Sequence, residues 1–439
     1  MLFHRLGILL LLSLSLPLAS PLAAQPLQGR IKKILKLHPR VHWGLYAVQA
    51  KNGRVLAKWN EQQFFVPASN TKLFSTSFAL ATFGPEHRFH TRVLASAPPD
   101  ENGVLHGNLV LYGEGDPSLS SRIYPYDVRN AYSPDRLAPL RELAAQLKQK
   151  NIRLVTGSLI GDDTYFEHRP VPSGWGAGDS QYSYGAPVSA LSFNDNAIAW
   201  KSENGQIVLD PPLPEYTPSL PASRPSGEFA VDDPALFAAR AFRLVLEQEG
   251  IAVLGPTEAR HTPQASPEQI ELARRTSPPL DQLLTVANKV SQNLHCELLR
   301  RAAEKQQKLE DFLRRAGVNP ERDTYLTDGS GLSRQNLVSP VATVSLLRHL
   351  WSTPWREQFA SFLPTGATDG TLRRRFNGNE RARAIQAKTG TLSHVSALGG
   401  YATSKKYGTV IFQIVANNFN EPSAGVLAAI DALALEFVR

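Results

Sequence analysis

The two ends of the chain carry similar patterns, each with a pair of short strands beside a helix. Residues 43–59 predict two strands around Asn52-Gly53, a dipeptide that favours a tight hairpin turn. Residues 394–419 predict a second strand pair, and residues 421–439 predict a terminal helix. Strands at both ends, with helices beside them, indicate one α/β unit that is assembled from both termini.

The middle of the chain has a different character, with short strands and turns. A proline-dense link at residues 210–227 has no helical period, whereas residues 232–250 predict a helix that is capped by Asp232 or Asp233. We therefore expect a main domain that is interrupted by one or two small β-rich domains. The expected division gives 25–84 and 266–439 to the main domain and 85–265 to the inserted region.

The first 24 residues have the features of a secretory signal peptide: a basic Arg5, a leucine-rich core and small residues at Ala23 and Ala24. Pro17 and Pro21 shorten the apolar run below the roughly 20 residues that a membrane span needs. A permanent membrane helix is the alternative. We expect cleavage near Ala24, an exported protein in the periplasm or elsewhere outside the cytoplasm, and no stable transmembrane anchor.

Composition narrows the class further. The single cysteine, Cys296, excludes an intrachain disulfide, so an exported chain must depend on a sizeable apolar core, which 42% apolar residues make possible. We expect Cys296 itself to be a small buried apolar side chain. The net charge is +8, but the basic residues are dispersed, and we therefore expect no nucleic-acid partner.

Ser69 lies three residues before Lys72, where a helical apolar pattern begins. Residues at this spacing share one face of a helix, so the amine of Lys72 can lie against the hydroxyl of Ser69. A serine nucleophile needs such a neighbour to take its proton, and lysine is a useful base only when burial or a second cation lowers its pKa. The pair therefore predicts another lysine nearby; the alternative is an ordinary helix start.

Lys388, Thr389 and Gly390 open the C-terminal strand pair and supply that second cation. Gly390 permits a close backbone approach to a ligand, and Lys388 and Thr389 could hold a carboxylate at the strand edge. The alternative is a strand start with a solvated lysine.

A third element, Ser-x-Asn, occurs three times. Ser291–Asn293 lies in a helical apolar pattern outside the inserted region, whereas Ser192–Asn194 and Ser202–Asn204 are typical of turns. At Ser291–Asn293 the hydroxyl could relay a proton and the amide could orient a substrate carbonyl.

These three elements, in this order, resemble the S-x-x-K, S-x-N and K-T-G set of the serine penicillin-recognising enzymes. The long interval between Ser69 and Ser291 indicates one branch, and the mature chain resembles the low-molecular-mass class C penicillin-binding proteins, the D-alanyl-D-alanine carboxypeptidase/endopeptidase family. One departure is Gln292, which occupies a position where Asp is frequent. The resemblance rests also on five segments, which are 113–119, 157–166, 184–196, 328–340 and 368–376.

The resemblance implies an α/β (α+β) fold, with a penicillin-binding-protein/β-lactamase-like transpeptidase domain and a strand-rich insertion. It also implies that Ser69 attacks a terminal D-Ala-D-Ala bond, that Lys72 removes its proton, and that Ser291 and Lys388 pass a proton to the leaving D-alanine. The backbone N–H groups of Ser69 and Thr391 would form the oxyanion hole. Asn293 would position the peptide.

The same resemblance gives expectations for ligands. Lys388, Thr389 and Thr391, beside Gly390, would receive the terminal carboxylate of peptidoglycan stem peptides, and Asp162, or the adjacent Asp163, would bind the free amine of a diaminopimelate-type side chain. β-Lactams would acylate Ser69. No metal and no organic cofactor is implied.

Other readings remain open. A β-lactamase or esterase on the same scaffold would need a deacylating carboxylate, and no Glu stands out for that task. A non-catalytic envelope-binding protein could also keep the scaffold. Ser330, in a glycine-rich stretch, lacks the spacing of a nucleophile elbow, and we expect a loop at the rim of the site. His295 and His394 neighbour the site in sequence, and we expect both to be packed or exposed side chains.

Overall fold

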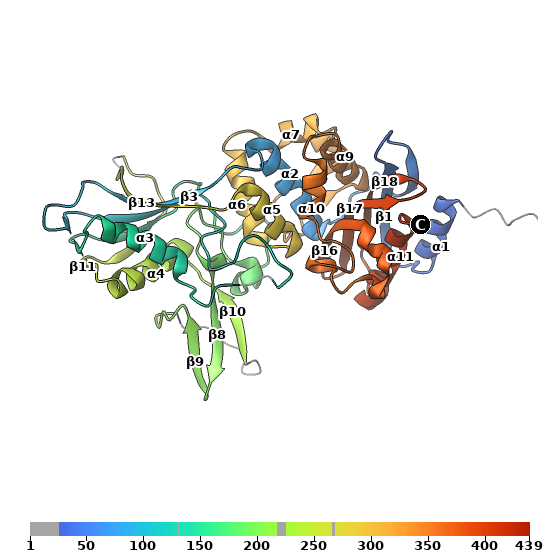
Figure 1. Ribbon diagram of the computed structural model, residues 1–439. Coiled ribbons are helices and arrows are strands. Elements are labelled where there is room, and N and C mark those ends of the chain that lie inside the picture. Colours follow the sequence, from blue (N-terminus) through green and yellow to red (C-terminus); the bar gives the residue numbers. More distant parts are fainter. Residues whose placement is uncertain (1–25, 130–131, 217–224, 266–267) are drawn as a thin grey trace, which may run out of the picture.

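The computed structural model describes residues 26–129, 132–216, 225–265 and 268–439. The expected signal peptide therefore lies outside the described residues. Helices and strands form two bodies, with the chain ends in one and the middle of the chain in the other (Figure 1). Among the described residues, no helix combines the length and apolar character that crossing a bilayer requires.

The body made from the chain ends is built on a five-stranded antiparallel sheet. The N-terminal strand β2 (Val55–Trp59) forms one edge and pairs with β1 (His42–Gln49). Strand β1 pairs with β18 (Gly408–Asn417), which is followed by β17 (Val395–Ser404) and β16 (Ile385–Leu392). Both predicted strand pairs are confirmed. The sheet order β16-β17-β18-β1-β2 shows that the two termini build one unit, as expected.

Helices cover both faces of this sheet, because successive side chains of its central strands point to opposite faces and nearly all of them are buried. One face packs against α1 (Leu27–Lys36) and α11 (Ser423–Glu436), with Leu45 and Ala47 of β1 in the shared core. Val48 instead joins the core on the other face. The helices of that second layer are α2 (Thr71–Phe83), α5 (Leu280–Lys289), α6 (Asn293–Glu304), α7 (Leu309–Arg315), α8 (Pro320–Asp323), α9 (Pro340–Trp351) and α10 (Arg356–Phe362), with a short pair β14 (Thr324–Tyr325) and β15 (Leu337–Val338).

The inserted region contains a second five-stranded sheet, in the order β12-β7-β5-β3-β13. Helices α3 (Ala138–Gln149) and α4 (Pro234–Gln248) cover it, and Asp233 caps α4, one of the two caps expected. Its strands are β3 (His90–Ala95), β5 (Leu109–Gly113), β7 (Leu159–Asp162), β12 (Thr257–Arg260) and β13 (Ile270–Thr276).

Strand β13 pairs with β3, so the chain stays in this sheet past the expected boundary at residue 265. The reason is that β13 needs β3 as its partner, a pairing between residues far apart in the sequence that no local pattern reveals.

Two smaller sheets complete the inserted region. One has three two-residue strands, which are β4 (Val104–Leu105), β6 (Leu154–Val155) and β11 (Ala252–Val253). The other is an antiparallel arm that projects from the body (Figure 1), made of β8 (Ala197–Glu203), β9 (Gln206–Asp210) and β10 (Ser226–Ala230). Most of the predicted proline link falls between β9 and β10 and lies partly outside the described residues.

Candidate active site

Ser69 lies in a single 3₁₀ turn, η1 (Ala68–Asn70), that leads directly into α2. Ala68 has a φ of 48°, a left-handed conformation that a non-glycine residue adopts only when its surroundings impose it. The first ten residues of α2 are all buried, which fixes the helix and therefore the side chain at its start. Packing, rather than a capping side chain, holds this turn in place.

Lys72 is fully buried beneath Ser69. Its Nζ lies 2.9 Å from Ser69 Oγ, 2.6 Å from Asn293 Oδ1 and 2.6 Å from the carbonyl oxygen of Ser330. No carboxylate of the described residues forms an ion pair with it. Burial lowers the pKa of Lys72 from its usual value.

These three neighbours suit a neutral amine as well as an ammonium ion, and burial favours the neutral form. A neutral lysine has two N–H donors and one lone pair, whereas the ammonium has three donors and no acceptor. The amide oxygen of Asn293 and the carbonyl of Ser330 can only accept hydrogen bonds, and the hydroxyl of Ser69 can donate one. The lone pair of a neutral Lys72 therefore faces the proton that a serine nucleophile must lose.

Lys388 is the second buried lysine, as the sequence predicts. It lies on β16, and its Nζ is 2.9 Å from Ser291 Oγ and 3.0 Å from the carbonyl oxygen of Thr389. Burial and then the charge of Lys72 lower the pKa of Lys388 well below its usual value. A second buried amine with a lowered pKa thus lies beside a second hydroxyl.

The strand that carries Lys388 lies tightly against the Ser69 turn. Asn70 Nδ2 donates to the carbonyl oxygen of Lys388 at 2.8 Å. A Cβ at Gly390 would lie 2.6 Å from the carbonyl oxygen of Pro67, so this position accepts only glycine without movement of the backbone. Gly390 is therefore needed for the approach of the strand to the nucleophile.

Ser291 and Asn293 lie at a break between two helices, which differs from the continuous helical stretch that the sequence predicts. Helix α5 ends at Lys289, Ser291 has a φ of 62°, and α6 begins at Asn293. The left-handed Ser291 interrupts the helix, and its hydroxyl meets Lys388 while Asn293 meets Lys72. Asn293 Nδ2 also donates to the carbonyl oxygen of Tyr184, 2.7 Å away, in the inserted region.

The glycine-rich stretch 328–331 is a loop beside Lys72, where we expect a loop at the rim of the site, and it is buried. Ser330 is completely buried, and its carbonyl accepts a hydrogen bond from Lys72. Asp328 accepts hydrogen bonds from four groups that hold the loop: Gly331 N, Ser333 N, Asn336 Nδ2 and Trp175 Nε1. The loop turns inward because these donors surround the carboxylate.

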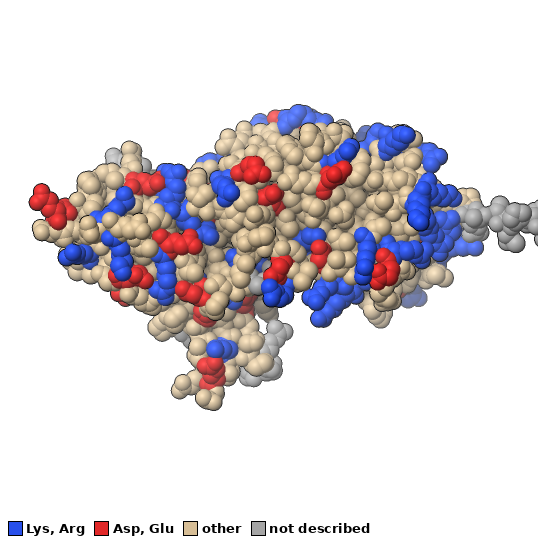
Figure 2. Space-filling model, in the orientation of Figure 1, with Lys and Arg blue, Asp and Glu red and all other residues tan. Residues whose placement is uncertain are grey.

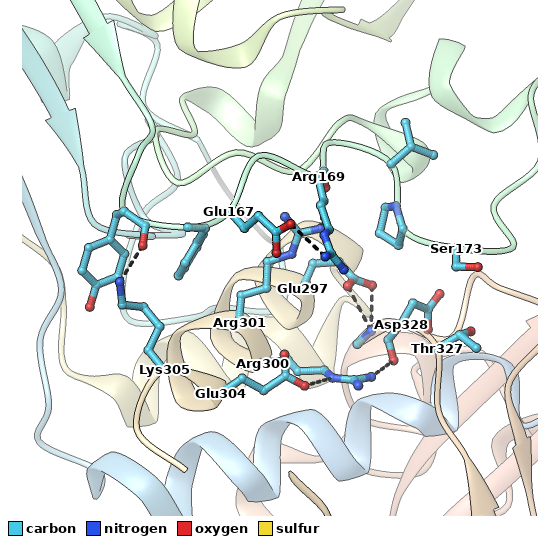
Figure 3. Close-up of a pocket in the computed structure, with 15 residues that line it drawn as sticks. Glu167, Arg169, Ser173, Glu297, Arg300, Arg301, Glu304, Lys305, Thr327 and Asp328 are labelled. Atoms are coloured by element: carbon cyan, nitrogen blue, oxygen red, sulfur yellow. Dashed lines mark hydrogen bonds and ion pairs between the residues drawn. The ribbon is translucent and has the colours of Figure 1, made fainter. Parts of the chain in front are cut away.

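Glu297 of α6 holds the same loop from its other side, where it accepts hydrogen bonds from the backbone N–H groups of Gly329 and Ser330. Burial and then the charge of Asp328 raise the pKa of Glu297. This glutamate and Asp328 line a cavity of about 770 Å³ between α6 and residues 165–173, together with Arg300 and Arg301 (Figure 3). Ser69, Lys72 and Lys388 do not line this cavity.

Of the remaining predicted residues, Thr389 and Thr391 lie on the same strand as Lys388, whereas Asp162 lies in the inserted region. Thr389 lies beside Lys388, and its hydroxyl meets that of Thr371 at 2.7 Å, whereas Thr391 is exposed near the end of β16. Asp162 is buried at the end of β7, where Oδ2 lies 3.1 Å from Arg260 and Oδ1 accepts a hydrogen bond from Thr164 N.

Within the part of the chain that the structure describes, no hydrogen bond or ion pair joins Asp162 or Asp163 to Ser69, Lys72 or Lys388. Asp163 instead contacts Ser189 and His261.

Cys296 and His295 are packed, and His394 is exposed, the other of the two states that we expect for the histidines. Cys296 is buried, and burial raises the pKa of its thiol to about 12. His295 is completely buried and lies 3.4 Å from Asp195, and His394 contacts the carbonyl oxygen of Phe419.

Four contributors to the site have no local motif: Asn70, Tyr184, Ser330 and Thr371. All four act through backbone groups or tertiary contacts, which a sequence pattern does not encode. The "DGSGLSR" segment is the one signal that could point to a buried carbonyl beside Lys72.

A serine, two buried amines and a bridging amide in this arrangement define a serine acyl-transfer enzyme. Residues 27–218 and 217–435 match the D-Ala-D-Ala carboxypeptidase 3 (S13) family, and the chain belongs to this family. It is thus a serine DD-peptidase, a hydrolase, as the sequence predicts. A D-alanyl-D-alanine carboxypeptidase of Actinomadura sp. (strain R39) is 29% identical over 90% of this chain and 81% of that relative.

Solved structures agree with this assignment. The fold is similar to that of penicillin binding protein 4 (dacB) from Haemophilus influenzae, with a TM-score of 0.79, 23% identity, and coverage of 93% of this chain and 99% of that chain. The same protein complexed with a novel beta-lactam gives a TM-score of 0.74 at 22% identity, with the same coverage. The expected penicillin-binding-protein fold with additional strand-rich parts is confirmed.

Proposed function

We propose that Ser69 is the nucleophile of this DD-peptidase and that neutral Lys72 is its general base. The observation that carries the assignment is the set of three neighbours around Lys72 Nζ, which leaves its lone pair directed at Ser69. Ser69 attacks the carbonyl of the terminal D-Ala-D-Ala bond, Lys72 takes the proton, and an acyl-enzyme forms. Water then releases the acyl group.

The proton of the leaving amine comes from the second half of the site. Ser291 donates its hydroxyl proton to the leaving amine, and the proton that Lys72 took from Ser69 restores the Ser291 hydroxyl. Lys388 Nζ, 2.9 Å from Ser291 Oγ, holds that hydroxyl in place. Backbone N–H groups of Ser69 and Thr391 are the proposed oxyanion hole. Asn293 positions the peptide, and Lys388, Thr389 and Thr391 beside Gly390 receive the terminal carboxylate. The reaction uses no metal or organic cofactor.

An acidic side chain that binds the amine of a diaminopimelate-type substrate should be accessible and free of a cationic partner. Asp162 meets neither condition, because it is buried and paired with Arg260. Asp179 is partly exposed, has no ion pair among the described residues, and accepts a hydrogen bond from Tyr184 OH. The carbonyl of Tyr184 in turn contacts Asn293. We therefore favour Asp179 for the role that the sequence suggests for Asp162.

Matched variants separate these two aspartates. Asp179→Asn should slow the hydrolysis of stem peptides with a free side-chain amine by about tenfold and leave short D-Ala-D-Ala mimics unaffected. Asp162→Asn should not discriminate between the two substrates. The reverse pattern would assign the role to Asp162.

β-Lactams should acylate Ser69, because their ring presents the same kind of carbonyl to the same nucleophile. A complex with a beta-lactam exists for the structural relative from H. influenzae.

Cleavage of D-Ala-diaminopimelate cross-links is a second proposed reaction, and mass spectrometry of purified muropeptides distinguishes it from the loss of one alanine. A β-lactamase would instead show rapid turnover of a chromogenic cephalosporin.

The Ser69→Ala variant tests the central assignment. It should lose both labelling by fluorescent penicillin and release of D-alanine, with an unchanged melting temperature. Retained peptidase activity would reject Ser69 as the nucleophile. A wild-type chain that fails to be labelled would favour a non-catalytic envelope-binding protein.

We also propose that the chain is exported to the periplasm or another extracytoplasmic compartment, since its substrate lies there.

A further inference from the structure

Three side chains gather at one edge of the inserted region, outside the Ser69 site. Asp163 follows β7 and His261 follows β12, and these parallel neighbours end at the same edge of their sheet. The backbone N–H of Asp163 donates to the carbonyl oxygen of Arg260 at 3.1 Å, which fixes the two segments together. His168 comes from the chain that leaves β7. The DD-peptidase reaction proposed above uses none of the three, since Asp163, the alternative to Asp162, is likewise buried and is held by Ser189 and His261.

Their donor atoms have the spacing of ligands around one metal ion. His261 Nδ1 lies 2.9 Å from Asp163 Oδ1, and His168 Nδ1 lies 3.5 Å from Asp163 Oδ2. One ligand atom from each residue lies within 4.8 Å of the others, and the two imidazole centroids are 4.1 Å apart. Zinc bonds of about 2.0–2.1 Å in a tetrahedron separate the ligand atoms by about 3.3 Å. The observed separations bracket this value.

Further contacts orient these side chains as outer partners orient metal ligands. Asp233 Oδ2 lies 3.3 Å from Nε2 of His261, the ring nitrogen that does not face Asp163. A carboxylate behind a ligating imidazole is the usual arrangement at zinc sites. Ser189 Oγ donates to Asp163 Oδ2 at 2.8 Å, and Asp233 is itself fixed as the cap of α4.

We propose that Asp163, His168 and His261 form a binding site for one divalent transition-metal ion of the zinc type. The three protein ligands leave a fourth position for water. His168 and His261 also line a cavity of about 180 Å³ that Pro170, Val188 and Pro234 border. Two imidazoles and one carboxylate suit zinc or cobalt and not calcium or magnesium, which prefer oxygen ligands.

The site would join the sheet edge to the chain that runs on to Tyr184. Among the described residues, Asp163, His168 and His261 are the one group of three His, Cys, Asp or Glu side chains whose ligand atoms lie close enough together to hold a metal ion. An ion here would fix His168 to the ends of two strands, and the segment after His168 reaches Asn293 through the carbonyl of Tyr184. The predicted role is therefore structural support, with no direct part in peptide hydrolysis.

The test uses the full mature chain without a histidine tag, stripped of metal with a chelator and titrated with Co²⁺. We expect one Co²⁺ per chain, with the intense visible absorption of a four- or five-coordinate site, and displacement by one equivalent of Zn²⁺. Mg²⁺ and Ca²⁺ should not displace it. Absence of the visible bands would overturn the proposal.

Variants locate the site. His168→Ala and His261→Ala should each weaken binding at least tenfold, and Asp233→Asn should weaken it about tenfold by loss of orientation. His106→Ala is the matched control, because this exposed histidine also lies beside an aspartate, with Nε2 3.1 Å from Asp100, and should bind Co²⁺ like the wild type.

Penicillin labelling of each variant reports independently that the chain is folded. If His261→Ala does not fold, His168→Ala decides, since the His168 side chain is 38% exposed and replaceable. Unchanged affinity in a folded His168→Ala variant would contradict the proposal.

Discussion

Single side chains at this site are fixed by what their neighbours can donate or accept. Lys72 has two pure acceptors and one hydroxyl around its nitrogen, and Lys388 has one carbonyl and one hydroxyl. Burial disfavours the charged form of both amines. The sequence alone predicts both lysines, because each lies in a short local motif. It also predicts that they lie close together, because a second cation nearby lowers the pKa of a lysine base. It does not predict the carbonyl of Ser330 as a partner, because a backbone group has no signature of its own.

Gly390 provides a test at the residue scale. In Gly390→Ala the added methyl group would lie 2.6 Å from the carbonyl oxygen of Pro67, and β16 must move away from the Ser69 turn. Since misplacement by about 1 Å can cost about 10²-fold in rate, we expect acylation by a fluorescent penicillin to slow by about 10- to 100-fold. Gly29→Ala is the control, because a Cβ there meets nothing within 4 Å. Equal acylation rates in the two variants would contradict the close approach.

At the scale of elements, the ends of helices place the proposed catalytic groups, at a point where the sequence predicts a continuous helical stretch. The break between α5 and α6 at Ser291 directs two side chains, Ser291 and Asn293, to two different lysines. A helical apolar pattern predicts the two helices but hides the break, because apolar residues on either side of it continue to face the same core. The sequence likewise predicts a glycine-rich loop at residues 328–331. It does not predict the inward position of the loop, because that position depends on Asp328 in the loop together with Glu297 on α6.

Asp328 therefore tests the loop as a unit. Asp328→Ala removes the acceptor of four buried or partly buried donors that include Gly331 N and Ser333 N. We expect a loss of about 2–4 kcal/mol in the free energy of unfolding, and slower acylation, because the carbonyl of Ser330 loses its fixed position beside Lys72. Urea denaturation measures the first effect.

Asp311→Ala, which removes an exposed partner of Arg314, is the control for Asp328→Ala and should change stability by less than about 1 kcal/mol. A similar small change in Asp328→Ala would contradict the role of its carboxylate.

The whole molecule has separate apolar cores. One core lies between the sheet and helices of the inserted region and includes Phe242, whereas α2 and α6 share a different core behind the active site. Lys and Arg side chains gather at the end of the molecule that lies away from the inserted region, where α1 carries Lys33 and Lys36 (Figure 2). The assembly of one domain from both termini is predictable, because strand pairs mark both ends. The sheet of the inserted region is not, because its order joins strands such as β3 and β13 that are distant in sequence.

Phe242→Ala tests this separation. The buried ring lies in the core of the inserted region, and its loss should lower the free energy of unfolding by about 3–5 kcal/mol through the cavity that remains. At temperatures where the variant is folded, we expect acylation of Ser69 within about twofold of wild type. Differential scanning calorimetry and penicillin labelling measure the two effects. A large fall in acylation would show that the two cores are tightly coupled.

The claim on which this account depends is that Lys72 is an uncharged base beside Ser69. The most direct measurement is the pH dependence of the second-order rate constant for acylation by a fluorescent penicillin. The rate constant should rise as Lys72 loses its proton and then level off, at a pH below the usual lysine value of 10.5, because burial lowers the pKa of Lys72. A rate constant that still rises about tenfold per pH unit near pH 10 would show a protonated Lys72 and contradict the account.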